Sequence, residues 1–513
     1  MRAGFRIARQ VSGLTLGLAL LGFAASASAA SVSVTDGLVL DHVTVVDTHD
    51  GRLSPDRAVV VVDGRIARIL AARDVTVGGS ARLVDARGKF LVPGFNDMHA
   101  HPVDSPDPEG DYAMMLVNGI TGVRQMSGSP DLLQARRDGK LMPYAAAPEI
   151  LAMPGTILTF ANAGTVDLAR AEVDRQKAEG ADFIKTISVS PPVFFAALDE
   201  ANKVGLPYVG HLSQGVSATQ ASKDGMRSIE HLGPIETLLI NCSSDEDAIW
   251  ASLAHPAAPP VARLDLNALP KGMDRRQAVA NPVLSEIISD PTALPRIEHV
   301  ADTFSEAKCR EAAKVFITHD TWQVPTLIRL RRMLFGDDPQ YVNDPDLRYL
   351  PPGSRQLWKT VDQQFADQVT PGDRAILTKL WLVLLKTTMI FDQAGVRMMA
   401  GSDVVGGFSL HHEFDLLGEA GLSPLTVLQM TTLNGAEFLG REKTMGSVEA
   451  GKDANLVLLD ANPIASVQNL HRIFAVVRAG TYYSRSDLDA LAAHTEERMK
   501  TPAVAALPAP DDL

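Results

Sequence analysis

The sequence has little cysteine: Cys242 and Cys309 are the only two among 513 residues. Two thiols cannot supply a cysteine-rich metal site, so a metal ion would need histidine, carboxylate or modified side chains as ligands. In an oxidising compartment the pair could form a disulfide. Buried free thiols are the interpretation that the sequence favours.

Positive charge is also scarce. The chain carries 48 lysines and arginines against 61 aspartates and glutamates, a formal net charge of −13 at pH 7. Such a surface repels phosphate backbones, and no stretch combines clustered basic and aromatic residues. We therefore expect no nucleic-acid partner.

Long apolar runs are confined to the N-terminus. Arginines among the first residues precede an apolar segment over residues 14–25, and Ala27-Ser28-Ala29 is typical of a small-residue cleavage site. A membrane anchor is the alternative, but the apolar core is shorter than the roughly 20 residues that a spanning helix needs. We expect a signal peptide over residues 1–29 and a secreted or periplasmic protein with no stable membrane anchor after cleavage.

Strand-like runs separated by turn residues fill residues 30–90, with Asp63-Gly64 as a hairpin signal between two of them. Similar runs return over residues 441–485. We expect these two terminal segments to form one small β-sandwich that flanks a central domain. Residues 486–513 are expected to form a C-terminal helix and a disordered tail.

Residues 91–440 alternate apolar runs with helical segments, which is typical of a parallel α/β fold. The expected strands lie near residues 94–101, 121–126, 149–153, 183–187, 207–211, 228–231, 324–327 and 397–403. Eight such units predict a TIM (β/α)8 barrel, whose catalytic groups lie at the C-terminal ends of the strands. Residues 234–320 are too long for a structureless loop and predict a helical insertion near the barrel mouth, which either shapes the substrate pocket or only stabilises the fold.

The first of these strands ends in His99-Ala100-His101. Because side chains alternate along a strand, Asp97, His99 and His101 share one face, where two imidazoles can bind a divalent metal and the carboxylate could orient a ring. An isolated pair of this kind is more often two exposed histidines. The interpretation changes because other predicted strands end in further metal-competent residues. These are Lys185, His211, His231 and Asp403.

Lys185 determines the chemistry that we expect. An ammonium group repels a dication, so the amine must be deprotonated or converted by carbon dioxide into a carbamate whose oxygens bridge two metal ions. A bridging water then becomes a hydroxide nucleophile near neutral pH. Asp403 is expected to act as the general acid/base that takes the proton and returns it to the leaving nitrogen. Zinc is the expected metal, and manganese, iron and cobalt suit the same ligand types.

Several motifs, taken in order, resemble the amidohydrolase superfamily, and within it the binuclear-metal, carbamylated-lysine group that is similar to imidazolonepropionase-like and Xaa-Pro-dipeptidase-like hydrolases. They lie at residues 93–101, 119–124, 184–185, 210–212, 228–232, 400–403, 431–436 and 446–457. The resemblance implies two divalent metal ions, a carbamate on Lys185 and a possible homo-oligomer. It covers the chain from about residue 37 to residue 480, apart from the insertion.

The resemblance also implies a role for each residue. His99, His101 and Asp403 would hold the more buried metal ion, His211 and His231 the more exposed one, and carbamylated Lys185 would bridge them. His411 would lie beside the site, as a substrate contact or behind the ligands; a surface histidine is the alternative.

Two features bear on the substrate. Dipeptidase-like relatives follow the lysine strand with a Ser-Gly-Gly turn, whereas this chain continues from Thr186 to Pro192 without one, so dipeptidase specificity does not transfer. Three arginines beyond the seventh strand could bind a substrate carboxylate or could be exposed solubilising residues. They are Arg329, Arg331 and Arg332.

We therefore predict a metal-dependent hydrolase of carbon–nitrogen bonds with a small amide or peptide-type substrate. Within the enzymes, the alternatives are a cyclic amide or imidazolone hydrolase and a deaminase. A non-catalytic periplasmic metal- or solute-binding protein is the alternative from another class, and Asp403 discriminates, because a binding protein has no use for a proton shuttle there.

Overall fold

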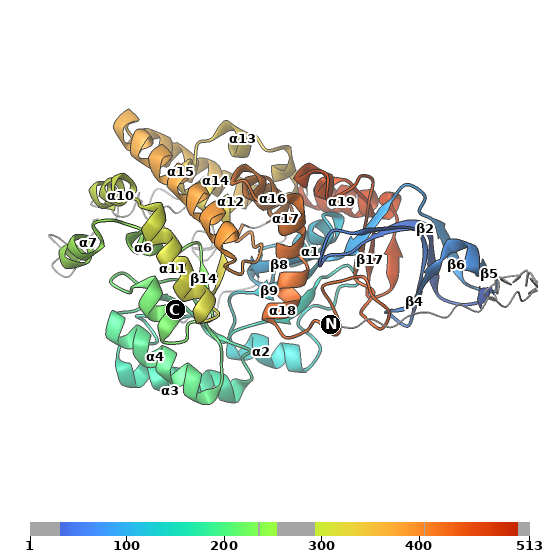
Figure 1. Ribbon diagram of the computed structural model, residues 1–513, viewed down its shortest axis with the longest axis horizontal. Coiled ribbons are helices and arrows are strands. Elements are labelled where there is room, and N and C mark those ends of the chain that lie inside the picture. The colour runs from blue at the N-terminus through green and yellow to red at the C-terminus, as the bar shows by residue number, and fades with distance from the viewer. Residues whose placement is uncertain (1–30, 234–235, 254–292, 405, 501–513) are drawn as a thin grey trace, which may run out of the picture.

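The computed structural model describes residues 31–233, 236–253, 293–404 and 406–500. The predicted signal peptide, part of the predicted insertion and the predicted disordered tail lie outside these ranges. A β-rich part forms one end of the molecule, and strands surrounded by helices form the rest (Figure 1). Within those ranges, no helix combines the length and apolar character that crossing a membrane requires.

The β-rich part is built from both ends of the chain. Its strands are β1 (Val32–Val34), β2 (Leu38–Val46), β3 (Leu53–Val62), β4 (Arg65–Ala71), β5 (Val75–Val77), β6 (Arg82–Asp85), β7 (Phe90–Pro93), β16 (Leu456–Leu459), β17 (Ile473–Arg478) and β18 (Thr481–Tyr483). One sheet has the order β18-β17-β16-β7-β2-β3-β4, with β6 paired to β2, while β1 pairs with β5. β16 pairs with β7 on one side and with β17 on the other, antiparallel in both cases. The C-terminal segment therefore completes a sheet that the N-terminal segment begins (Figure 1).

The predicted hairpin at Asp63-Gly64 is confirmed. Val62 pairs with Arg65 across the turn between β3 and β4. Asp63 and Gly64 have φ angles of 49° and 75°, the left-handed conformation that a two-residue hairpin of this twist requires. Asp tolerates that conformation better than most residues, and Gly adopts it freely.

The central part contains parallel strands. They are β8 (Phe95–Ala100), β9 (Ile120–Gln125), β10 (Glu149–Ala152), β11 (Leu158–Thr159), β12 (Ile184–Ser188), β13 (Tyr208–Gly210), β14 (Ser228–Glu230) and β15 (Trp322–Val324). They form two sheets, β10-β9-β8 and β11-β12-β13-β14-β15. The strand order follows the chain order and every pairing is parallel, as α/β units require.

Backbone hydrogen bonds connect the two parallel sheets on both sides. On one side the amide of Asp182, before β12, donates to the carbonyl of Met153, after β10, at 3.0 Å. On the other, the predicted eighth strand is present only as an isolated parallel bridge between Gln323 and Met398. That segment then turns toward β8, where the amide of Met98 donates to the carbonyl of Ala400 at 2.9 Å.

Helices follow most of the parallel strands and cover them. The helices are α1 (Pro108–Val117), α2 (Pro130–Arg137), α3 (Val166–Glu179), α4 (Pro191–Val204), α5 (Ala218–Lys223), α6 (Thr237–Ile240), α7 (Glu246–Leu253), α10 (Ala293–Asp302), α11 (Glu306–Thr318), α12 (Leu327–Leu334), α13 (Pro339–Val342), α14 (Pro352–Gln368), α15 (Pro371–Ala394), α16 (Ser409–Glu419), α17 (Pro424–Met430), α18 (Leu433–Phe438) and α19 (Arg485–Lys500). Short 3-10 turns lie at η1 (Ala72–Asp74), η2 (Pro102–Asp104), η3 (Pro345–Tyr349) and η4 (Val467–His471). The expected C-terminal helix is therefore present as α19.

The described part of the predicted insertion is helical and contains a disulfide. Cys242, just after α6, is bonded to Cys309 in α11, so the interpretation as free thiols is wrong. The two cysteines are 67 positions apart in sequence, and only the packing of the helices brings their Cα atoms to 4.2 Å. Both side chains are fully buried.

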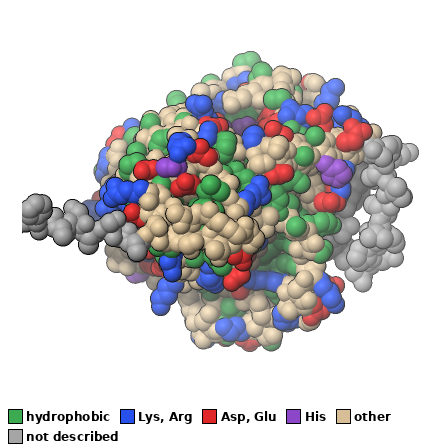
Figure 2. Space-filling view, turned by 90° about the vertical axis from the view of Figure 1, so that its right-hand side faces the viewer, with side chains coloured by type: hydrophobic (Ala, Val, Ile, Leu, Met, Phe, Trp, Pro, Cys, Tyr) green, Lys and Arg blue, Asp and Glu red, His purple; other side chains and the backbone are tan. Residues whose placement is uncertain are grey.

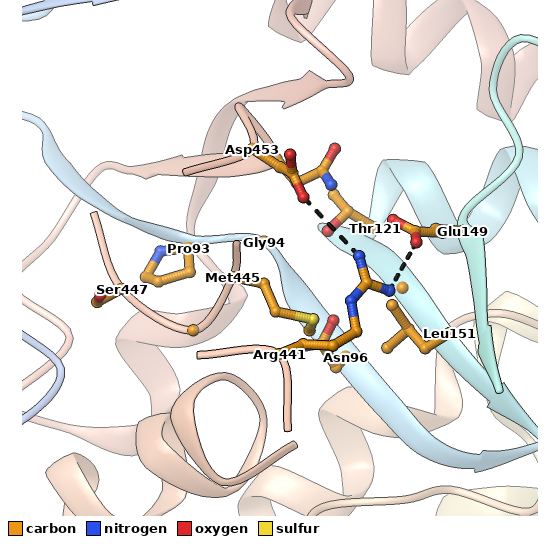
Figure 3. A pocket seen from close by; sticks show the side chains of 13 residues that line it. Pro93, Gly94, Asn96, Thr121, Glu149, Leu151, Arg441, Met445, Ser447 and Asp453 are labelled. Atoms are coloured by element: carbon orange, nitrogen blue, oxygen red, sulfur yellow. Dashed lines mark hydrogen bonds and ion pairs between the residues drawn. The ribbon is translucent and has the colours of Figure 1, made fainter. Parts of the chain in front are cut away.

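A small cavity lies where the β-rich part meets the N-terminal ends of the parallel strands (Figure 3). Arg441 reaches into it between two carboxylates, with Nη1 2.7 Å from Oε1 of Glu149 and Nη2 3.8 Å from Oδ2 of Asp453. The arginine thus ties β10 to the segment before β16. On the face that the β-rich part presents, acidic and basic side chains are interspersed (Figure 2).

Candidate metal centre

Asp403 lies at the centre of the predicted site. Its carboxylate oxygens lie 3.2 Å from Nε2 of His101, 3.4 Å from Nε2 of His231 and 3.6 Å from Nε2 of His99. His99 is the penultimate residue of β8, and His231 directly follows β14. The ends of neighbouring parallel strands meet at the same edge, which is why residues far apart in sequence come together here.

Lys185 and His211 complete the group. Nζ of Lys185, on β12, lies 3.3 Å from Nε2 of His99. The ring of His211, directly after β13, lies edge-on to that of His231, with 4.7 Å between the ring centroids. The structure therefore brings together all six residues that the sequence predicted as metal ligands. They are His99, His101, Lys185, His211, His231 and Asp403.

Glu230 orients the ring of His99, and the sequence had not singled it out. Oε2 of Glu230 lies 2.7 Å from Nδ1 of His99. The guanidinium of Arg124 donates to both Glu230 oxygens, at 2.8 and 3.0 Å. Burial raises the pKa of Glu230, but Arg124 and His99 outweigh it and hold the pKa below its usual value. Glu230 is therefore a carboxylate and can only accept, so Nδ1 of His99 carries the proton.

The prediction that Asp97 orients a histidine ring is corrected. Its oxygens accept hydrogen bonds from the backbone amide of Ser402 at 3.0 Å, the hydroxyl of Ser402 at 2.6 Å and the backbone amide of His99 at 3.0 Å. Burial raises the pKa of Asp97 to about 6. Asp97 thus joins the end of β8 to the segment that carries Asp403.

Glu230 could have been found from the sequence, because it stands directly before His231 at the end of a predicted strand.

His231 is held by a hydroxyl. Its Nδ1 lies 2.5 Å from Oγ1 of Thr326, whose own proton goes to the carbonyl of Pro325 at 2.8 Å. The hydroxyl must therefore accept from Nδ1, and Nε2 of His231 is left unprotonated. Among the described residues this buried Nε2 has no hydrogen-bond partner.

His101 is held by a small polar network. Its Nδ1 lies 2.9 Å from Oγ of Ser127 and 3.7 Å from Oδ2 of Asp104, and Gln125 donates to the same Asp104 oxygen at 3.1 Å. Burial lowers the pKa of His101, but hydrogen bonds to Asp104 and Asp403 raise it to about 9. Three histidines surround Asp403: His99, His101 and His231. In each of them Nδ1 is held by a neighbouring side chain and Nε2 faces Asp403.

Burial and nearby charges shift the pKa of the other groups of the centre. Burial lowers the pKa of His211 and of His231 well below the usual value, so both rings are neutral. Burial also lowers the pKa of Lys185 to about 8. Burial raises the pKa of Asp403, but Arg329, His99 and His101 hold it well below the usual value.

These residues fit a divalent metal ion. Ligand atoms of His99, His231 and Asp403 lie within 4.8 Å of one another. Two unprotonated ring nitrogens and a carboxylate facing one another in a buried site repel unless a cation lies between them. The main support for a metal ion here is the buried Nε2 of His231, which has no hydrogen-bond partner among the described residues.

His411 lies in a different environment. Its Nε2 is 2.9 Å from the carbonyl oxygen of Asn118, and its ring packs on those of Phe414 and His471. In the described part of the chain, these contacts place it in the helical layer and not among the ligands. Glu413, two residues further along α16, accepts a hydrogen bond from the amide of Ile328 at 2.8 Å.

The three arginines beyond β15 differ. Arg329 forms an ion pair with Asp403. Arg331 pairs with Asp338 at 2.7 Å. Arg332 is buried with its guanidinium 4.5 Å from the ring centroid of Trp358. Only Arg329 of the three is therefore placed to meet a ligand, and neither Arg331 nor Arg332 is an isolated exposed charge.

Comparison with known proteins agrees with this fold. The profile of the amidohydrolase family matches residues 388–482. Adenine deaminase 3 of Rhizobium johnstonii is 29% identical over 205 residues, which are 36% of this chain and 34% of the deaminase, so the chain spans about a third of that relative. An imidazolonepropionase of Symbiobacterium thermophilum is 22% identical over 436 residues, covering 80% of this chain and 85% of the relative.

Among solved structures, bottromycin amidohydrolase has a similar fold, with a TM-score of 0.62 at 22% sequence identity over 90% of each chain. Taken together, these matches show that the chain is similar to amidohydrolases, in sequence over residues 388–482 and in fold over most of its length.

Proposed function

We propose that the protein is a metal-dependent hydrolase of carbon–nitrogen bonds in small amide or peptide-type substrates. The observation that carries the proposal is the convergence of three inward-facing histidine nitrogens on Asp403, with Lys185 beside them. The similarity to amidohydrolases, which include deaminases and an imidazolonepropionase, supports the reaction class.

We infer that the two parallel sheets are arcs of one (β/α)8 barrel flanked by a β-sandwich. The backbone hydrogen bonds from Asp182 to Met153 and from Met98 to Ala400 support closure on both sides. Val34 and Val60 belong to one apolar cluster, which supports packing of β1 and β5 on the larger sheet. In such a barrel the mouth lies at the strand ends that carry the site.

Each residue has a role in the proposal. His99, His101 and Asp403 would hold one divalent ion, His211 and His231 a second, and a carbamate on Lys185 would lie between them, with zinc as the expected metal. When bound, the ions would lower the pKa of a water and polarise the carbonyl under attack. The lowered pKa of Lys185 supports the carbamate, because a neutral amine can attack carbon dioxide and release one proton.

Asp403 moves the proton. Its carboxylate takes a proton from the attacking water as the new C–O bond forms, then gives it to the leaving nitrogen as the C–N bond breaks. Arg329 pairs with the same carboxylate and supports its anionic form before attack. The buried Nε of Arg329 has no hydrogen-bond partner among the described residues, so the guanidinium keeps a free donor for a substrate carboxylate.

A cyclic amide or imidazolone hydrolase is the second candidate, favoured by the imidazolonepropionase match across most of both chains. A deaminase fits less well, because it generally needs one metal ion and leaves Lys185 without a role. A binding protein would leave Asp403 without a role.

We also infer that the protein is exported from the cell, which the buried Cys242–Cys309 disulfide supports. We further infer that it assembles into a homo-oligomer.

The test combines metal analysis with hydrolysis assays on protein made with bicarbonate and without chelators. We expect about two metal ions per chain and turnover of N-acyl amino acids, dipeptides or cyclic amides. Asp403→Asn should lower kcat by about 10²–10⁴-fold. Asp453→Asn, in the cavity at the opposite strand ends, is the control and should leave turnover intact. One metal ion or fewer, with no turnover, would overturn the proposal.

The role of Arg329 is tested by substrate pairs with and without a carboxylate. Arg329→Met should raise KM for the carboxylate-bearing member and leave the KM of the matching amide nearly unchanged. Arg331→Met, whose partner is Asp338, is the matched control and should change neither KM.

A further inference from the structure

The segment from Thr326 to Arg329, just after β15, supplies two contacts to the proposed metal centre. Thr326 accepts the proton of His231 Nδ1, and Arg329 pairs with Asp403. Any shift of this segment would therefore move both a histidine ligand and the carboxylate that we propose as the proton carrier.

The segment is not self-supporting. Thr326 has φ 46° and ψ 51°, a left-handed conformation that is rare and strained for a β-branched residue. Its side chain does not cap α12, because its hydroxyl is used by Pro325 and His231. The first amides of α12 thus need an acceptor from elsewhere, as every helix N-terminus does.

Glu413 of α16 is that acceptor. The amide of Ile328 donates to its Oε2 at 2.8 Å, and the amide of Leu327 also donates to it. Glu413 is fully buried, and its Oε1 has no hydrogen-bond partner among the described residues. A buried carboxyl group with one unpaired oxygen is costly, so an apolar side chain would be cheaper if packing of α16 on α12 were its only task.

We propose that Glu413 is a positioning residue for the metal centre: by accepting hydrogen bonds from the first turn of α12, it fixes Thr326 against His231 and Arg329 against Asp403. Glu413 touches neither metal ligand directly. The inference is tested by two measurements. The first, metal affinity, rests on the proposed metal centre, and the second, the tautomer of His231, rests only on its hydrogen bond to Thr326.

Two substitutions separate the hydrogen bond from packing. Glu413→Gln keeps a carbonyl oxygen for the amides of α12, whereas Glu413→Leu keeps the volume and removes the acceptor. Leu417→Ala is the matched control, because it opens a cavity one turn further along the same buried helix and leaves the carboxyl group of Glu413 in place. All three variants are compared with the wild type for metal affinity by chelator competition and for Tm.

We expect Glu413→Leu to weaken metal binding by about 10- to 100-fold, as loss of a supporting contact does. Glu413→Gln should stay close to the wild type, and Leu417→Ala should lower Tm without changing metal affinity. Equal metal affinity in wild type and folded Glu413→Leu overturns the proposal. An equal loss in Leu417→Ala does so as well.

The second readout needs no metal. In metal-free protein labelled with ¹⁵N-histidine, the His231 signal is assigned by its absence in His231→Asn. We expect the Nδ1–H tautomer in the wild type and in Glu413→Gln, and a mixture of tautomers in Glu413→Leu. An unchanged tautomer in Glu413→Leu overturns the positioning role. A wild type that binds no metal but shows this pattern contradicts the proposed function and leaves the positioning role supported.

Discussion

Nδ1 of His99 lies 2.7 Å from Oε2 of Glu230, and both side chains are almost completely excluded from solvent. The two residues come from β8 and β14, which belong to different parallel sheets. Arg124, from β9, completes the contact by donating to both oxygens of Glu230. A single buried carboxylate thus fixes the ring of His99, a proposed metal ligand, and neutralises the buried guanidinium of Arg124.

We expect Glu230→Gln to affect both tasks. Loss of its charge leaves Arg124 buried without a counter-ion, which costs about 3–5 kcal/mol of the free energy of unfolding. Loss of the fixed ring lowers metal affinity by about 10- to 100-fold. Urea unfolding and a metal titration measure the two effects.

The control for Glu230→Gln is Glu149→Gln. It removes a partner of Arg441 in a pair whose side chains are both about one-third exposed, and should cost less than about 1 kcal/mol. Unchanged metal affinity in Glu230→Gln would show that Glu230 does not orient His99.

We expect Lys185→Ala to lower the metal content from about two ions per chain to one or fewer, because the bridging carbamate is lost. Reactivation of chelated wild-type protein should require bicarbonate together with metal, and ¹³C-bicarbonate should give a carbamate signal. Lys203→Ala, an exposed lysine on α4, is the control. If Lys185→Ala retained the wild-type metal content, the two-metal arrangement would be wrong.

Glu413 should make the stability of metal-free protein depend on pH. Burial raises its pKa from 4.5 to about 8, so between these values the folded protein holds a proton that the unfolded chain has lost. The stabilisation from this group is complete below about pH 4.5 and is lost as the pH rises toward 8, by at most about 1.4 kcal/mol per pH unit.

Glu413→Gln removes this contribution. Urea unfolding in chelator at several pH values should therefore show the variant gaining stability relative to the wild type as the pH rises from 5 to 8. A difference between the two proteins that does not change with pH would contradict the prediction.

The disulfide should stabilise the helical part. Serine at both Cys242 and Cys309 opens a loop of 67 residues and should lower the free energy of unfolding by about 4 kcal/mol on the chain-entropy estimate. Unfolding without reductant measures the difference. With reductant, the wild type should fall to the level of the variant; a wild type that is insensitive to reductant, and equal to the variant without it, would mean that the bond does not form in solution.

Much of the site could be predicted from the sequence, because parallel strands place their C-terminal ends at one edge. His99 and His231 lie at such an end, so their convergence needed only the strand pattern, whereas Lys185, predicted to end a strand, is the second residue of β12. The hairpin at Asp63-Gly64 was predictable for a local reason, since its two residues favour the conformation that the turn needs.

Contacts between side chains were not predictable in the same way. Asp97 shares a strand face with His99, yet it bonds to Ser402, while the ring partner is Glu230 from another sheet. The predicted eighth strand is present only as a bridge at Met398, and the chain turns at Asp403, where φ is 49°.

The sequence by itself determined which residue types stand at the strand ends, and therefore the metal-binding chemistry, since periodicity and turn preferences are local properties of the chain. Only the tertiary structure decided how each ring is held, which arginine faces the site and that Cys242 meets Cys309. Those outcomes depend on distances of a few ångströms between segments far apart in sequence, and packing of the whole molecule sets these distances.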